Sequence, residues 1–133
     1  MKFFFDNCLP PLLAEALNVL CRHEGHTVVA LREMFSRDPG DVNWIRALDE
    51  QGGWVVISKD REMRASRLEH EALRRKGLTT FFLAKGWDQK QFWDICACLL
   101  RWWPVILEEA KRAASVTLFE VPARYGSGKL KRL

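Results

Sequence analysis

Residues 54–60, WVVISKD, are the segment of this 133-residue chain from which its fold can best be inferred. It is a short apolar run, rich in valine and isoleucine, that follows two glycines and ends in a carboxylate. Such a run is typical of a strand buried on both faces, which belongs near the middle of a parallel sheet. Asp60 stands where this strand ends, and open α/β sheets bind ligands outside the carboxyl ends of their strands. We therefore expect Asp60 to lie at a functional edge of the sheet.

The N-terminus repeats this arrangement. Residues 3–5 are three phenylalanines that predict another buried strand, and Asp6 stands at its end, before Asn7 and a turn that contains two prolines. Further strands are predicted over residues 27–31 and 78–84, with an edge strand over 116–121. Helices are predicted from the prolines at 10–11 to Gly25, over 41–51 and over the charged segment 61–76. Another is predicted from an Asp88 cap to about residue 114, with a break or sharp kink at Pro104. Strands that alternate with helices predict a three-layer α/β/α sandwich with a mostly parallel sheet.

Length and composition indicate one ordinary globular domain. We expect residues 1–123 to form this domain and residues 124–133 to form a basic, flexible tail. A hydrophobic content of 48% with 29% charged residues argues against wholesale disorder, and a net charge of +4 is compatible with a polyanionic partner. No apolar run approaches the roughly 18 residues that a membrane span needs, so we expect no membrane contact and a cytoplasmic location.

Several kinds of active site lack their sequence signatures. The four cysteines show no paired C-x-x-C spacing, which argues against a zinc site and against a disulfide framework. The three histidines have no ligand spacing between them, and no cysteine or serine nucleophile with a histidine base is indicated. A glycine-rich phosphate loop is also missing.

Three aspartates are expected to meet at one edge of the sheet. Asp6 and Asp60 end strands, and Asp41 begins the helix that leads into the strand ending in Asp60. Close carboxylates repel one another, and a hard divalent cation relieves that repulsion; oxygen-only ligation is typical of Mg²⁺ or Mn²⁺. Such a cation polarises a phosphoryl oxygen and lowers the pKa of a bound water, which can then attack phosphorus in line. Each aspartate also has a simpler interpretation, as a helix N-cap for Asp41, a turn former for Asp6 and a solvated carboxylate for Asp60.

Other polar side chains are expected around these carboxylates. Glu33 or Asp38 is a candidate fourth acidic ligand, although either could be an ordinary surface charge. Ser58 shares a sheet face with Asp60 and could donate a hydrogen bond to a neighbouring carboxylate. Basic residues of the charged segment could contact phosphates, or could form a solvated helix face. The candidate substrate-binding residues are Asn7, Ser58, Lys59, Arg61 and Arg64.

These motifs resemble the PIN domain superfamily, and within it the compact proteins related to VapC toxins. The likeness rests on FFFDN at 3–7, DVNWIRAL at 41–48 and VVISKDREM at 55–63, and covers about half the chain. In that family the first strand ends in Asp, another Asp opens the helix before the next core strand, and that strand ends in Ser/Thr-x-Asp. The resemblance implies an α/β/α sandwich, a Mg²⁺- or Mn²⁺-dependent ribonuclease acting on RNA, frequent homodimers and, for toxins, a cognate antitoxin. By this match Asp6, Asp41 and Asp60 are the metal-binding and catalytic residues.

The chain also departs from the family pattern. The family's second acidic residue usually lies on a helical segment after the second strand, whereas residues 32–40 predict only a short polar loop, with Glu33 as a stand-in. The tryptophan-rich segment after Gly86 is a second departure; Trp93 and Trp102 are candidates for a dimer or antitoxin contact, or for core packing.

Two rival hypotheses remain open: a PIN-like binding module that has lost catalysis, and a receiver-type domain. A receiver would need a pair of acids after its first strand, and only Asp6 is there.

Overall fold

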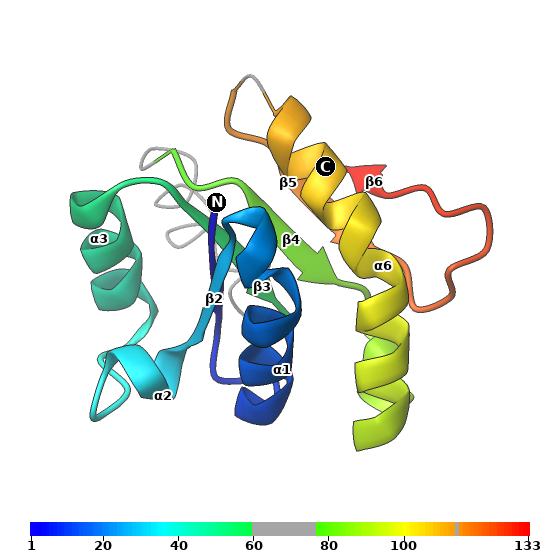
Figure 1. Ribbon diagram of the computed structural model, residues 1–133, viewed down its shortest axis with the longest axis horizontal. Coiled ribbons are helices and arrows are strands. Elements are labelled where there is room, and N and C mark those ends of the chain that lie inside the picture. Colours follow the sequence, from blue (N-terminus) through cyan, green and yellow to red (C-terminus); the bar gives the residue numbers. More distant parts are fainter. Residues whose placement is uncertain (60–76, 114) are drawn as a thin grey trace.

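The protein is a single six-stranded sheet with helices on both faces (Figure 1). The computed structural model describes residues 1–59, 77–113 and 115–133, with only the backbone of Asp41. The strands are β1 (Lys2–Phe5), β2 (Thr27–Ala30), β3 (Trp54–Ser58), β4 (Thr80–Leu83), β5 (Leu118–Val121) and β6 (Lys131–Arg132). The helices are α1 (Pro11–Cys21), α2 (Leu31–Met34), α3 (Asp41–Gln51) and α6 (Phe92–Arg112), with 3₁₀ turns η1 (Arg22–Glu24) and η2 (Lys85–Gln89).

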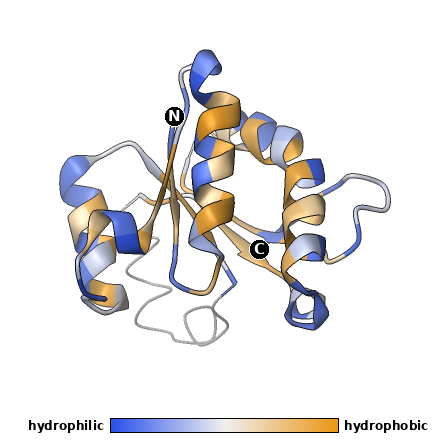
Figure 2. Cartoon of the chain, turned by 60° about the horizontal axis from the view of Figure 1, so that its bottom comes forward, coloured by the Kyte–Doolittle hydropathy of each residue, from blue (hydrophilic) through white to orange (hydrophobic). Residues whose placement is uncertain are grey.

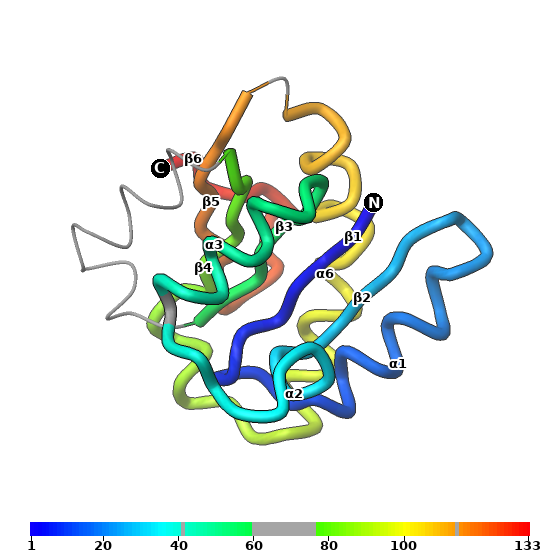
Figure 3. Tube along the Cα trace, turned by 90° about the vertical axis from the view of Figure 1, so that its left-hand side faces the viewer, coloured from blue at the N-terminus to red at the C-terminus, as the bar shows by residue number. Residues whose placement is uncertain are grey.

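The strand order is β2-β1-β3-β4-β5-β6, and every pairing is parallel except that of β5 with β6. The tube in Figure 3 follows β1 between β2 and β3. This architecture confirms the predicted α/β class with a mostly parallel sheet. The β3 strand is buried along its whole length, as its uninterrupted apolar sequence predicted.

Alternating side chains of each strand build two separate cores. Phe3 and Phe5 face α1 and α6, whereas Phe4 faces α3, where its ring centroid lies 4.8 Å from that of Trp44. In Figure 2 apolar residues line the strands and the inner helix surfaces, and the hydrophilic residues lie mostly on the outside. Burial of each phenylalanine contributes about 2–3 kcal/mol of transfer free energy. The helices are therefore held on the sheet by packing on both faces.

The parallel strands bring several helix starts to one edge. Because β1 to β5 run in the same direction, their carboxyl ends share this edge, and α1, α2, α3 and α6 all begin there, at the lower side of Figure 1. We call it the carboxyl edge. It carries the residues that directly follow each strand, which is where the sequence predicted the functional groups.

Helix α6 corrects two predictions. It runs from Phe92 to Arg112 and is not broken at Pro104, where the sequence predicted a break or sharp kink. Buried residues on both sides of the proline, among them Trp103 and Ile106, pack on the sheet and hold the helix together despite the missing N–H donor. Asp88 does not cap this helix; it lies in η2, and Gln91 is the N-cap.

The C-terminal residues also differ from expectation. Residues 124–133 were predicted to form a flexible tail, but they add β6 to the sheet beyond β5, so β5 is not an edge strand. Tyr125 packs on the buried Trp102, with ring centroids 4.8 Å apart. Trp102 is therefore a core residue, whereas Trp93 is 79% exposed.

Two further findings concern the remaining elements. The predicted polar loop after β2 contains a four-residue helix, α2, which carries Glu33. The predicted helix over 61–76 lies outside the described residues. Within the described part of the chain, no helix has the length and apolar character that a membrane crossing requires.

Candidate functional site

Asp6 is the best-defined acidic group at the carboxyl edge. It directly follows β1 and is only 4% exposed. Its backbone N–H donates to the carbonyl of Ile57 at 3.2 Å, which extends the β1–β3 pairing by one residue. The chain then turns, because the N–H of Leu9 donates to the carbonyl of Asp6 at 3.3 Å. The position of this carboxylate is thus set by the two central strands.

Hydrogen bonds from two different segments fix the orientation of the Asp6 carboxylate. The hydroxyl of Ser58, at the end of β3, donates to one oxygen, and the backbone N–H of Cys8 donates to the other at 2.7 Å. Such bonds stabilise an ionised carboxylate away from water. Ser58 is itself fully buried. It makes the carboxylate contact that the sequence suggested, and its burial fits a positioning role better than contact with a substrate.

The end of β1 is linked to α2 by side chains. Nε of Arg32 donates to Oδ1 of Asn7 at 3.2 Å, and both residues are exposed. Glu33 is the next residue of α2 and is also exposed at the same edge. A helix of one turn after β2 therefore places an acidic residue where the sequence predicted only a loop. Four residues are too few to show a helical apolar period, so the signal was weak.

The helix that begins with Asp41 starts at the same edge. Its N-cap is Gly40, with φ of 87°, a conformation that glycine adopts without strain, so Asp41 is the first helical residue rather than the cap. The neighbouring Asp38 accepts a hydrogen bond from the N–H of Gly40 at 2.9 Å, which is a loop-stabilising role. An acid in the first turn is favoured by the helix dipole.

The remaining predicted site residues fall into two groups. Lys59 follows β3 and is half-buried. Asp60, Arg61 and Arg64 lie outside the described residues, as does the side chain of Asp41. The structure thus places Asp6, Asn7, Ser58 and Glu33 at one edge and starts α3 there.

The chemistry of these donors fits a hard divalent cation. Asp6 is a carboxylate held in a fixed orientation, and Glu33, which α2 places at the same edge, also offers oxygen only. The described residues alone contain no cluster of three acidic, histidine or cysteine ligands. The side chains of Asp41 and Asp60, which the sequence predicted as further ligands, lie outside the described residues.

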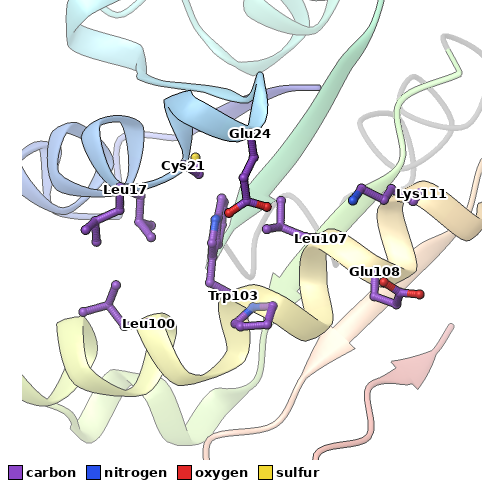
Figure 4. A pocket seen from close by; sticks show the side chains of 10 residues that line it. Leu17, Cys21, Glu24, Leu100, Trp103, Leu107, Glu108 and Lys111 are labelled. Atoms are coloured by element: carbon purple, nitrogen blue, oxygen red, sulfur yellow. The ribbon is translucent and has the colours of Figure 1, made fainter.

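A pocket between α1 and α6 is a separate feature (Figure 4). Its volume is about 310 Å³, and Cys21, Glu24, Trp103 and Lys111 are among its lining residues. Burial raises the pKa of the Cys21 thiol, so this thiol is protonated at neutral pH and is not an activated nucleophile. The pocket carries no catalytic set comparable to the carboxyl edge.

Comparison with known proteins agrees with this architecture. A family model described as "PIN like domain" matches residues 1–85, which is more than half of the chain. No curated protein and no solved structure gave a match. The chain therefore belongs to the PIN-like domain family. PIN-like domains are typically nucleases, and PIN nucleases typically use divalent metal ions.

Proposed function

We propose that this protein is a metal-dependent endoribonuclease that hydrolyses RNA phosphodiester bonds. The observation that carries the proposal is the buried Asp6 carboxylate, held by Ser58 at the carboxyl edge of a PIN-like domain. Asp6, Asp41 and Asp60 would hold Mg²⁺ or Mn²⁺, with Glu33 as a further acidic ligand. The bound cation would supply positive charge to a phosphoryl oxygen and increase the acidity of a water molecule.

The surrounding residues prepare the site for that chemistry. Ser58 and the N–H of Cys8 hold the Asp6 carboxylate in one orientation before any substrate arrives, so little reorganisation is needed. Asn7 and Arg32 are exposed and hydrogen-bonded to each other, which places polar groups where an RNA strand would pass. Lys59 and the arginines that follow it would neutralise phosphates.

The toxin role is a finer part of the same proposal. The likeness of the quoted motifs to those of VapC toxins supports it, and a cognate antitoxin would then keep the enzyme inactive in the cytoplasm. Expression of the protein without such a partner is expected to arrest growth of a bacterial host, and the arrest should vanish in the Asp60→Asn variant.

The direct test is cleavage of a structured RNA pool by purified protein in Mn²⁺ or in EDTA. Wild type should cleave only with Mn²⁺, and both Asp6→Asn and Asp60→Asn should lose at least about 100-fold in rate. Glu15→Gln, which removes an exposed acid on α1, is the matched control and should cleave normally. Normal cleavage by Asp60→Asn would contradict the assignment. Absence of both cleavage and Mn²⁺ binding in wild type would instead favour a PIN-like binding module.

A further inference from the structure

We propose that a groove between α6 and the segment after β5 binds the phosphate backbone of single-stranded RNA. We call it the α6–β5 groove; it has a volume of about 450 Å³ and begins at the carboxyl edge. Its described lining residues all lie beyond residues 1–85, which the family model matches, so it is a feature of this chain rather than of the matched region. Among its lining residues are Lys90, Asp94, Cys98, Arg101, Arg124 and Tyr125.

The charge of the groove favours an anionic ligand. Lys90, Arg101 and Arg124 line it, and among its described lining residues Asp94 is the one that carries a carboxylate. Among the described residues, none of these three cations forms an ion pair within 4 Å. Guanidinium groups bind phosphate oxygens in a two-pronged geometry, and cationic side chains supply most of the sequence-independent affinity for nucleic acid.

Two of the three cations, Lys90 and Arg101, lie on aromatic rings that hold them in place. The Arg101 guanidinium carbon lies 4.4 Å from the centroid of the Tyr125 ring, and Nζ of Lys90 lies 5.6 Å from the centroid of a Trp87 ring. Tyr125 packs in turn on the buried Trp102. Rings that support cations reduce the side-chain entropy lost on binding, so the groove is partly preorganised.

The wall opposite α6 is held by hydrogen bonds and close packing. The indole N–H of Trp87 donates to the carbonyls of Val121 and Pro122 at 3.0 and 3.1 Å. The thiol of Cys98 donates to the carbonyl of Ala123 at 3.5 Å. A Cβ on Gly86 would lie 2.6 Å from that of Ala123, so only glycine allows this approach. The wall is therefore a built surface rather than a loose loop.

The position of the groove relates it to the proposed nuclease site, and the inference rests on that proposed function. Both open at the carboxyl edge, and a strand spacing of about 4.8 Å puts β4 and β5 roughly 10 and 14 Å from β1 across the sheet. An RNA strand held at the Asp6 carboxylate, directly after β1, would thus extend toward the cations beside β5. An acidic protein segment is the other ligand such charge would attract.

The test is binding of a fluorescein-labelled, mixed-sequence single-stranded RNA, measured by anisotropy in EDTA so that no cleavage occurs. Arg124→Gln is expected to weaken binding about fivefold, and the Arg101→Gln/Arg124→Gln double variant should reduce the slope of log affinity against log salt by about 1.4. Arg22→Gln, an exposed arginine on η1 outside the groove, is the matched control and should bind as wild type does. If the Arg101 variants melt at a lower temperature because Arg101 no longer contacts Tyr125, Lys90→Gln takes their place in the binding assay. This variant removes a cation of the groove and keeps the Arg101–Tyr125 contact, and it should also bind RNA more weakly than wild type does.

Cleavage with Mn²⁺ is measured in parallel to separate the two proposals. Weaker RNA binding by the groove variants supports the groove, even if wild type shows no cleavage and the nuclease proposal fails. Binding by Arg124→Gln and the double variant that equals wild type overturns the groove and leaves the nuclease proposal intact. No RNA binding by wild type also overturns it, and binding of an acidic peptide in its place would assign the groove to a protein ligand.

Discussion

Substitution of Ser58 by alanine tests whether the β1–β3 junction organises the candidate metal site. The change removes the hydroxyl that donates to the Asp6 carboxylate, and because Ser58 is fully buried, water cannot readily replace the donor. A hydrogen bond to a charged group contributes about 1.5–3 kcal/mol, so we expect the free energy of unfolding to fall by about 2 kcal/mol. Ser127→Ala removes an exposed hydroxyl and should change it by less than about 0.5 kcal/mol.

Two assays follow from this substitution. Urea unfolding, followed by tryptophan fluorescence, measures the stability change; a double-mutant cycle with Asp6→Asn should show a coupling of about 1.5–3 kcal/mol. Calorimetric titration with Mn²⁺ should show affinity reduced about 10- to 100-fold, the usual effect of removing a group that orients a metal ligand. Wild-type stability together with wild-type Mn²⁺ affinity in Ser58→Ala would refute the reasoning that this hydroxyl holds the site.

Three further predictions concern stability and assembly. Burial and, to a lesser extent, the positive N-terminal amine lower the pKa of His26 below its usual 6.5. The free energy of unfolding should therefore decrease as the pH falls below about 6.5, because the folded protein disfavours the protonated ring. In urea unfolding His26→Gln should remove this pH dependence, whereas the control His23→Gln, at an exposed histidine, should keep it. Pro104→Ala should raise the free energy of unfolding by about 1–2 kcal/mol, because alanine restores an N–H that can donate to the carbonyl of Leu100 within a continuous helix. A destabilised variant would contradict this account of α6. Trp93 is 79% exposed and lies beside leucines of α1, on an apolar face suited to the predicted homodimer. Light scattering should show a dimer for wild type and a monomer for Trp93→Glu. A monomeric wild type would show that the predicted dimer is wrong.

Short apolar runs made most of the sheet predictable from sequence. The runs FFF and WVVI, which became β1 and β3, contain no break in apolar character, and short runs of this kind are typical of a strand buried on both faces. The errors arose where tertiary contacts outweigh local preference. Pro104 lowers helix propensity, yet packing of Trp103 and Ile106 on the sheet keeps α6 continuous. The two residues of β6, Lys131 and Arg132, pair with β5 without any apolar pattern of their own.

The candidate site was predictable to the level of the sheet edge. Asp6 was found because it ends a strand, and parallel strands carry their ends to one side. The hydrogen bond from Ser58 to Asp6 depends on the neighbour relation of β1 and β3, which are separated in sequence by β2; no local pattern specifies that pairing. Helix α2 was missed for a different reason, since its single turn leaves no period to detect. Tertiary pairing, rather than residue type, is what sequence reasoning lacked here.

The two proposed regions of the carboxyl edge should be separable by kinetics. Residues that contact RNA only at the α6–β5 groove lie beside β5, away from the carboxylates, and so would stabilise the bound substrate and the transition state equally. Loss of such uniform binding raises KM and leaves kcat unchanged. Arg124→Gln is therefore expected to raise KM, whereas Asp6→Asn should lower kcat because the carboxylate acts where charge develops in the reaction. A fall in kcat with unchanged KM in Arg124→Gln would mean that this arginine reaches the reacting phosphate, and the groove would then be part of the catalytic site itself.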